Sequence, residues 1–142
     1  MKAVVIGLGR IGLPLALVAA DAGIDVTGID IKKELIGGLL NKKVPFYEPY
    51  MEELLKKHCQ KNFYPKLQED AVDDIERAGY IIITIGTEFV KYPQKPSIDR
   101  LFSIIDDLLQ IGIRDKTVII RVTLPIGYTA VSYTHLTLPT KA

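Results

Sequence analysis

Short apolar runs alternate along the chain with segments in which apolar residues recur every three or four positions. The apolar runs predict strands at 2–6, 25–30, 64–68, 80–85 and 117–122. The periodic segments predict helices within 11–22, 32–40, 50–59, 71–77 and 101–109. Strands that alternate with helices in this way are typical of a doubly wound parallel α/β sheet with right-handed crossovers.

The first predicted helix has an apolar face and a clear stop signal. Its apolar face carries four residues: Ile11, Leu15, Val18 and Ala22. Gly23 follows at the position where a glycine commonly ends a helix. We therefore expect the helix to begin soon after the first strand and to stop before Gly23.

Composition and charge restrict the class of protein. The 142 residues are enough for one domain with a substantial core, and 48% hydrophobic with 25% charged residues is ordinary for a soluble globular protein. Lysine and arginine number 18 against 17 acidic residues, so no net field attracts nucleic acid or an anionic membrane. We expect neither nucleic acid nor a membrane as a partner.

Targeting and redox signals point to the cytoplasm. The longest apolar stretch, 13–20, is too short to span a bilayer and contains Pro14. The chain enters its first strand directly after Met1, which leaves no room for a signal peptide. Cys59 is the single cysteine, so an internal disulfide is excluded and a reducing compartment fits.

A glycine-rich segment carries the main functional signal. Gly7-Leu8-Gly9-Arg10-Ile11-Gly12 directly follows the first strand, and Asp30 ends the second strand eighteen residues later. A lone Gly-x-Gly-x-x-Gly is weak evidence, but a strand before it, a helix after it and an acid at this distance are typical of a dinucleotide-binding βαβ unit. The alternative is a glycine-rich strand-to-helix turn beside a solvated aspartate.

Each residue of this constellation has a chemical reason. Gly7 permits the tight turn, Gly9 lets the backbone approach a pyrophosphate, and Gly12 lets the helix pack close to the strand. The N–H groups at the helix start face the phosphates, where the helix dipole favours negative charge. Asp30 accepts hydrogen bonds from the adenosine ribose and would repel a 2′-phosphate. The pattern therefore predicts NAD rather than NADP as the cofactor, with no metal site.

Three further segments give the chain a family resemblance. Together with the glycine-rich segment, Val-Pro-Phe-Tyr-Glu-Pro at 44–49, Ile-Gly-Thr at 85–87 and Arg-Val-Thr-Leu-Pro-Ile-Gly at 121–127 resemble the nucleotide-sugar dehydrogenases. This family comprises the UDP-glucose, GDP-mannose and UDP-N-acetylhexosamine 6-dehydrogenases, and the likeness covers about 1–129. The resemblance implies an oxidoreductase of polysaccharide biosynthesis with a UDP-sugar substrate. The sugar C6 alcohol would be oxidised to the uronate in two NAD-dependent steps, through a thioester on a catalytic cysteine.

The resemblance also implies the site residues. The implied cofactor-binding residues are Gly7, Leu8, Gly9, Arg10, Ile11, Gly12, Asp30, Lys33, Gly86, Thr87 and Thr123. Lys32 is an alternative to Lys33, because the match at these two positions is loose. Thr87 would approach the cofactor, and Thr123 would have a supporting catalytic role near the nicotinamide or the water network at the reacting carbon. The Tyr-Glu-Pro loop would shape the substrate side.

Two positions depart from the family pattern, and the catalytic segment is missing. Glu88 occupies the position of a usual loop proline, and Tyr50 that of a glycine. The chain has no Gly-Gly-x-Cys segment. Cys59 follows His58 in a predicted helix, where adjacent side chains point about 100° apart, so the two do not form a nucleophile–base pair. We expect the chain alone to bind NAD without turnover, and family members usually form homodimers when full length.

The last residues break the alternating pattern. A helix should follow 127–129, but 131–140 is strand-like and resembles the translation of a transposon-end sequencing adapter. We therefore expect 1–130 to be a truncated NAD-binding Rossmann domain, with a sheet incomplete at its C-terminal edge, and 131–142 to be a non-native tail. A genuine, divergent edge strand is the alternative, and His135 receives no role.

Two further functions fit the first half of the pattern. One is the cofactor domain of another Rossmann dehydrogenase, of the hydroxyacyl-CoA or 6-phosphogluconate type, although 44–49 and 121–125 argue against it. The second is a non-catalytic module that senses NAD. The sequence does not identify the sugar, but the resemblance of the loop residues to the family slightly favours an N-acetylhexosamine.

Overall fold

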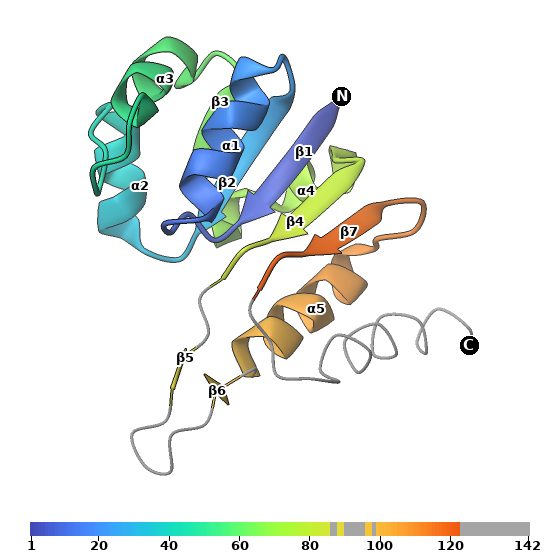
Figure 1. The fold of residues 1–142 in the computed structure, drawn as a ribbon. Helices are drawn as coiled ribbons and strands as arrows, with labels where there is room; N and C mark the ends of the chain where they lie inside the picture. The colour runs from blue at the N-terminus through green and yellow to red at the C-terminus, as the bar shows by residue number, and fades with distance from the viewer. Residues whose placement is uncertain (86–87, 90–95, 98, 123–142) are drawn as a thin grey trace.

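The computed structural model describes residues 1–85, 88–89, 96–97 and 99–122. Its main sheet is parallel and five-stranded, with the order β3-β2-β1-β4-β7 (Figure 1). These strands are β1 (Lys2–Ile6), β2 (Asp25–Asp30), β3 (Phe63–Leu67), β4 (Tyr80–Ile83) and β7 (Thr117–Ile120). The described helices are α1 (Gly12–Asp21), α2 (Lys33–Leu40), α3 (Met51–His58), α4 (Val72–Arg77) and α5 (Asp99–Ile111), with a short 3-10 turn at Gln68–Asp70.

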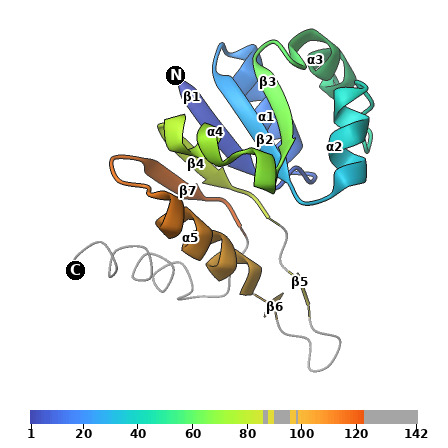
Figure 2. The same ribbon diagram turned by 180° about the vertical axis from the view of Figure 1, so that it is seen from behind.

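Helices cover both faces of the sheet. α1, α2 and α3 lie on one face, and α4 and α5 lie on the other, as Figures 1 and 2 show from opposite sides. Successive residues of a strand point to opposite faces, so Val4 packs in the core with Ile81 while Val5 packs in the core with Leu17. Burial on both faces explains why the strands are continuous apolar runs. The prediction of a doubly wound Rossmann sheet is confirmed.

The strand order creates a switch point between β1 and β4. The chain moves outward from β1 to β2 and β3, then returns to β4 on the other side of β1, with all strands parallel. Connections therefore diverge to opposite faces at the carboxyl ends of β1 and β4, which is where ligands bind in open α/β sheets.

The predicted apolar face of α1 is not the face that packs. The buried residues of α1 are Gly12, Leu13, Ala16, Leu17 and Ala20. Ile11, just before the helix, is 52% exposed and Val18 is 59% exposed. The prediction was wrong because α1 is apolar almost all round, so periodicity did not discriminate between faces. The small alanines lie against the sheet and allow a close approach.

Element boundaries otherwise shift by one or two residues from those predicted. A short antiparallel pair that was not predicted, β5 (Glu88–Phe89) with β6 (Pro96–Ser97), comes between β4 and α5 in the chain. Among the described residues, β7 pairs only with β4 and forms an edge of the sheet. Residues 131–142 lie outside the described part, so the domain boundary near 130 stays a prediction. No helix in the described ranges is long and apolar enough to cross a membrane.

A close approach at Gly12 holds α1 against the carboxyl ends of β1 and β4. A Cβ at this position would lie 1.8 Å from the carbonyl oxygen of Gly7 and 2.3 Å from Oγ1 of Thr84. The Thr84 hydroxyl, just after β4, donates a hydrogen bond to that same Gly7 oxygen at 2.7 Å. The Gly7 carbonyl, the Thr84 hydroxyl and the helix start therefore occupy one crowded volume without room for a side chain.

Replacement of Gly12 by alanine is expected to destabilise the fold severely. The added methyl group overlaps backbone that cannot move without separating α1 from β1, and overpacking of this kind costs about 3 kcal/mol or more. Urea denaturation followed by circular dichroism measures the free energy of unfolding. Gly37→Ala in α2 is the matched control, because its Cβ would meet no atom within 4 Å. It is expected to raise stability by about 0.5–1 kcal/mol, and equal losses in both variants would contradict a steric cause.

An ionic network fastens the far end of α1 to α3. The His58 ring Nε2 lies 2.8 Å from Oδ1 of Asp21, and its Nδ1 lies 2.7 Å from Oδ1 of Asn62. The Asn62 amide donates to the carbonyl of Ala20, which orients its oxygen towards the histidine. Lys57 also approaches Asp21, at 3.3 Å. The hydrogen bond from His58, followed by the contributions of Lys57, holds the pKa of Asp21 below its ordinary value of 3.8.

This network predicts a pH-dependent contribution of Asp21 to stability. A carboxyl whose folded-state pKa is depressed stabilises the fold above its unfolded pKa, and the contribution disappears as the pH falls through the folded pKa. We expect Asp21→Asn to be less stable than the parent chain at pH 7, with a difference that shrinks below about pH 4. Urea midpoints measured from pH 7 down to pH 2.5 test this, and a difference that stays constant over the range would exclude an ionic origin.

Candidate dinucleotide-binding site

The turn between β1 and α1 is shaped by three glycines with different environments. Gly7 has a φ of +98°, which favours glycine, and its N–H donates to the carbonyl of Ile29 at 2.8 Å. Gly12 is required by packing, as described above. Gly9 is different: a Cβ there would meet no protein atom within 4 Å, and its φ lies outside the left-handed region. The protein itself gives no reason for a glycine at this position, whereas close approach by a ligand does.

The start of α1 is suited to an anion. Ile11 stands at the N-cap and makes no side-chain capping hydrogen bond, and the first turn of α1 carries no acidic residue. The Leu13 N–H donates to the carbonyl of Gly9 at 3.1 Å and Pro14 has no N–H, so backbone donors for an anion must come from residues 9–12, at an end that the helix dipole makes electropositive. A diphosphate placed beside Gly9 would therefore meet backbone donors and no opposing charge from the helix.

Asp30 lies at the carboxyl end of β2 and links the two loops that border the site. Its side chain is buried, Oδ2 accepts the Leu8 N–H at 3.0 Å, and Oδ1 accepts the Lys32 N–H at 3.1 Å. A carboxylate has about four lone-pair positions, so each oxygen still has one free to accept a hydroxyl. A vicinal diol such as that of a ribose matches this arrangement.

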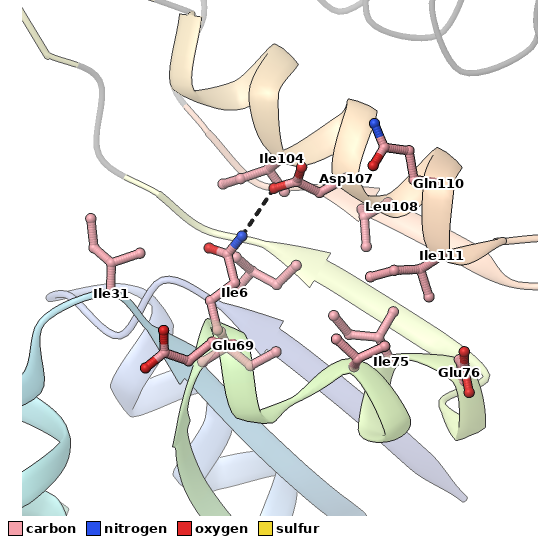
Figure 3. Close-up of a pocket in the computed structure, with 13 residues that line it drawn as sticks. Ile6, Ile31, Glu69, Ile75, Glu76, Ile104, Asp107, Leu108, Gln110 and Ile111 are labelled. Atoms are coloured by element: carbon pink, nitrogen blue, oxygen red, sulfur yellow. Dashed lines mark hydrogen bonds between the residues drawn. The ribbon is translucent and has the colours of Figure 1, made fainter.

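Two cavities flank the Asp30–Ile31 peptide. The isoleucine cavity, of about 680 Å³, lies between the sheet edge and helices α4 and α5. Figure 3 shows Ile6 and Ile31 on one side of it and Ile104, Leu108 and Ile111 of α5 on the other. A hydrogen bond from the Gln68 amide to Asp107, 3.0 Å long, spans from the turn before α4 to α5. This cavity is largely apolar with polar groups at its rim.

The second cavity, here called the Arg10–Lys33 cavity, has a volume of about 760 Å³ and lies on the α1 and α2 side of Asp30. It is lined by Leu8, Gly9, Arg10, Asp30, Lys32, Lys33, Glu34, Leu35, Pro45 and Phe46. The guanidinium of Arg10 stacks over the Phe46 ring, 5.0 Å from its centroid. The 44–49 loop therefore contacts the glycine-rich turn, although more than thirty residues separate them in the sequence.

The structure brings five of the eleven predicted cofactor-binding residues together around one cavity. Leu8, Gly9, Arg10, Asp30 and Lys33 line one cavity, and Lys32 lines it as well. Ile11 lines neither of these two cavities. The predicted Gly86, Thr87 and Thr123 lie outside the described residues. Tyr50 adopts a left-handed backbone conformation, with a φ of +66°. Glycine adopts this conformation without strain, which explains the glycine at this position in the family pattern.

The sequence analysis did not identify three residues that shape the glycine-rich turn or line the two cavities. Thr84 looked like one more strand residue, and no local signal distinguishes it. Phe46 was assigned to the substrate-side loop, and its stacking on Arg10 depends on tertiary contact. Ile31 was detectable in principle, because the residue after the terminal acid of a strand must lie at the same sheet edge.

The single thiol is not part of this site. Cys59 is buried, its S–H donates to the carbonyl of Leu39 at 3.3 Å, and burial raises its pKa. It follows α3 and lies near the carboxyl end of α1, whereas the glycine-rich turn is at the amino end of that helix, about 15 Å away along its axis. His58 is engaged by Asp21 and Asn62 rather than by the thiol. Within the described ranges, no group of three potential ligands could hold a metal ion.

Comparison with known proteins agrees with this geometry. The model of the UDP-glucose/GDP-mannose dehydrogenase family, NAD-binding domain, matches residues 1–140. The UDP-N-acetyl-D-mannosamine dehydrogenase of Pyrococcus horikoshii is 32% identical over 130 residues, which are 91% of this chain and 30% of that protein. The UDP-glucose 6-dehydrogenase YwqF of Bacillus subtilis is 28% identical over 134 residues, which are 89% of this chain and 28% of that protein.

Solved structures show the same fold. The Pyrococcus horikoshii UDP-N-acetyl-D-mannosamine dehydrogenase superposes with a TM-score of 0.82 at 28% identity, covering 97% of this chain and 33% of that one. A GDP-mannose dehydrogenase from Pseudomonas aeruginosa superposes with a TM-score of 0.86 at 21% identity, covering 96% of this chain and 31% of that one. The chain spans less than a third of the length of the curated relatives it matches. It belongs to the UDP-glucose/GDP-mannose dehydrogenase family and carries that family's NAD-binding domain.

Proposed function

We propose that NAD binds across the carboxyl edge of the sheet, with its diphosphate at the Gly9 turn and its adenosine ribose on Asp30. The observation that carries this proposal is the empty space around the Cβ position of Gly9, beside a helix start without a side-chain cap. Asp30 supports it, because both of its oxygens keep a free lone pair for a ribose hydroxyl. When bound, the nicotinamide ring supplies the hydride-accepting chemistry of the site.

The isoleucine cavity is proposed to receive the adenine. Ile31 follows Asp30 directly and lines this cavity, so a base attached to a ribose on Asp30 lies beside it. A flat aromatic ring gains stability from apolar walls on both sides, which Ile31 and the α5 residues Ile104 and Leu108 supply (Figure 3). Gln68 and Asp107 stand at the rim with hydrogen-bonding groups.

Gly9→Val is expected to separate cofactor binding from folding. The valine side chain enters the space assigned to the diphosphate, so the affinity for NAD should fall at least about tenfold, equivalent to about 1.4 kcal/mol. No protein atom lies within 4 Å of the new Cβ, so the free energy of unfolding should change by less than about 0.5 kcal/mol. Titration calorimetry with NAD and urea denaturation measure the two effects. Gly37→Ala, which lines neither cavity, should bind NAD as the parent does, and unchanged binding by Gly9→Val would remove the diphosphate from this turn.

For the whole protein, we propose a nucleotide-sugar 6-dehydrogenase that oxidises the C6 alcohol of a UDP-sugar to the uronate in two NAD-dependent steps. Family membership supports this reaction class, and two of the relatives named above, from Pyrococcus horikoshii and Bacillus subtilis, act on UDP-sugars by name. Three relatives are UDP-N-acetyl-D-mannosamine dehydrogenases, which supports an N-acetylhexosamine as the sugar. Thr87 would contact the cofactor, Thr123 would stand near the nicotinamide, and a homodimer is the proposed assembly.

The chain by itself is expected not to oxidise a nucleotide sugar. A thioester needs an accessible thiolate, but the one cysteine is buried, bonded to a carbonyl oxygen and remote from the glycine-rich turn. Absorbance at 340 nm should show no NADH from NAD with UDP-glucose, UDP-N-acetylglucosamine or UDP-N-acetylmannosamine, even at stoichiometric protein. Cys59→Ser should behave identically. NADH formed in proportion to protein, and lost in Cys59→Ser, would show that this thiol is catalytic after all.

A further inference from the structure

The isoleucine cavity combines apolar walls with one hydrogen-bonded polar pair, Gln68 and Asp107. Ile104, Asp107 and Ile111 follow one another at intervals of three and four residues, so they share one face of α5. Figure 3 shows Asp107 beside Ile104, with its hydrogen bond reaching away from α5. The packing of an apolar helix face does not require an acid at this position. The carboxylate therefore stands where a ligand between the isoleucines would meet it.

Among the polar residues that line this cavity, Gln68 and Asp107 are the two that are half-buried. Glu69, Glu76 and Gln110 also line it, but all three are exposed. A group in contact with water loses little when a ligand leaves it unpaired, whereas a group that the ligand covers loses its hydrogen bonds to water. Discrimination between ligands in this cavity therefore depends chiefly on the Gln68–Asp107 pair.

The carboxylate fixes the orientation of the glutamine. Nε2 of Gln68 donates to Oδ2 of Asp107 at 3.0 Å. An ionised carboxylate only accepts hydrogen bonds, so the amide turns its nitrogen rather than its oxygen towards Asp107. Neither side chain has another hydrogen-bond partner among the described residues. The second N–H of Gln68 and Oδ1 of Asp107 remain available, so the pair offers a donor next to an acceptor.

Adenine presents the complementary arrangement. Its 6-amino group donates, and the ring nitrogens on either side of that group accept. Hypoxanthine and guanine carry a 6-oxo group instead, which accepts. A 6-oxo oxygen would face the carboxylate of Asp107 as acceptor against acceptor. The apolar walls cannot make this distinction, because they would stack on either base equally well.

We infer that the Gln68–Asp107 pair makes the isoleucine cavity selective for adenine over 6-oxo purines. Asp107 accepts a hydrogen bond from the 6-amino group, and Gln68 donates one to a neighbouring ring nitrogen. The inference rests on the proposed placement of the adenine in this cavity. It adds to that placement a selectivity that apolar contact alone does not supply.

The test compares NAD with nicotinamide hypoxanthine dinucleotide, in which a 6-oxo group replaces the 6-amino group. Titration calorimetry gives both affinities for the 142-residue chain. The parent chain is expected to bind NAD at least about tenfold more tightly, because the 6-oxo base loses a hydrogen bond and meets a repelling carboxylate. 5′-AMP and 5′-IMP should show the same preference, which assigns the effect to the base.

Variants of the pair separate selectivity from general binding. An asparagine amide accepts from an amino group or, turned over, donates to an oxo group, so Asp107→Asn should bring the two affinities within about threefold of each other. Asp107→Ser repeats the test with a hydroxyl, which also donates or accepts. Gln68→Met keeps the length of the side chain but removes the donor, and should weaken NAD about threefold or more.

Glu69→Gln is the matched control. It removes an exposed carboxylate from the wall of the same cavity, where water screens the charge, and should keep the preference of the parent chain. Circular dichroism verifies the folding of each variant. If neither Asp107 variant folds, the preference of the parent chain decides, because that measurement needs no variant.

The outcomes distinguish the two proposals. A parent chain that binds no NAD overturns the proposed function, and the selectivity falls with it. A parent that binds both dinucleotides equally overturns the selectivity alone. A preference that survives in folded Asp107→Asn and Asp107→Ser also overturns it, as does an equal loss of preference in Glu69→Gln. Unchanged NAD affinity in Gln68→Met would exclude the glutamine contact.

Discussion

The contact at Gly12 is the constraint on which the carboxyl edge of this sheet depends. Because no side chain separates α1 from the Gly7 carbonyl and from Thr84, the helix starts directly against the ends of β1 and β4. That closeness sets the height of the first helical turn above the sheet edge. It also allows the small residues Ala16 and Ala20 to pack on the sheet further along the helix. A bulkier contact would tilt α1 away and open the turn in which a diphosphate is proposed to lie.

Asp30 has one structural role and one proposed role in binding, and both depend on the same atoms. Its carboxylate joins the turn before α1 to the loop before α2 through two backbone N–H groups. Those hydrogen bonds hold the side chain in place and leave lone pairs free for the ribose proposed to bind there. A rigid acceptor would lose little entropy when a ribose binds. The hydrogen bonds that link the two loops would therefore also favour the proposed contact with the ribose. As a result, a substitution at Asp30 would affect the link between these loops together with the proposed ribose contact.

Much of the fold was predictable because its signals are local. A parallel sheet buried on both faces produces uninterrupted apolar strands such as 3–6 and 80–83, and these were located within two residues. The glycine-rich turn and Asp30 were found because a short range of sequence contains the whole motif. Lys33 was assigned loosely by resemblance, and its side chain does line the cavity beside Asp30.

Features that depend on distant contacts were not predictable in the same way. The buried face of α1 was misassigned, since a helix apolar almost all round has no periodic contrast to read. The role of Thr84 requires knowing that β4 neighbours β1, across nearly eighty residues. The stacking of Arg10 on Phe46 joins a turn to a loop that no pattern connects. That contact has an evolutionary consequence: the two positions share one interaction, so a lineage that replaces the arginine loses the reason to keep an aromatic ring at 46. Residues 10 and 46 should therefore change together when homologous sequences are aligned.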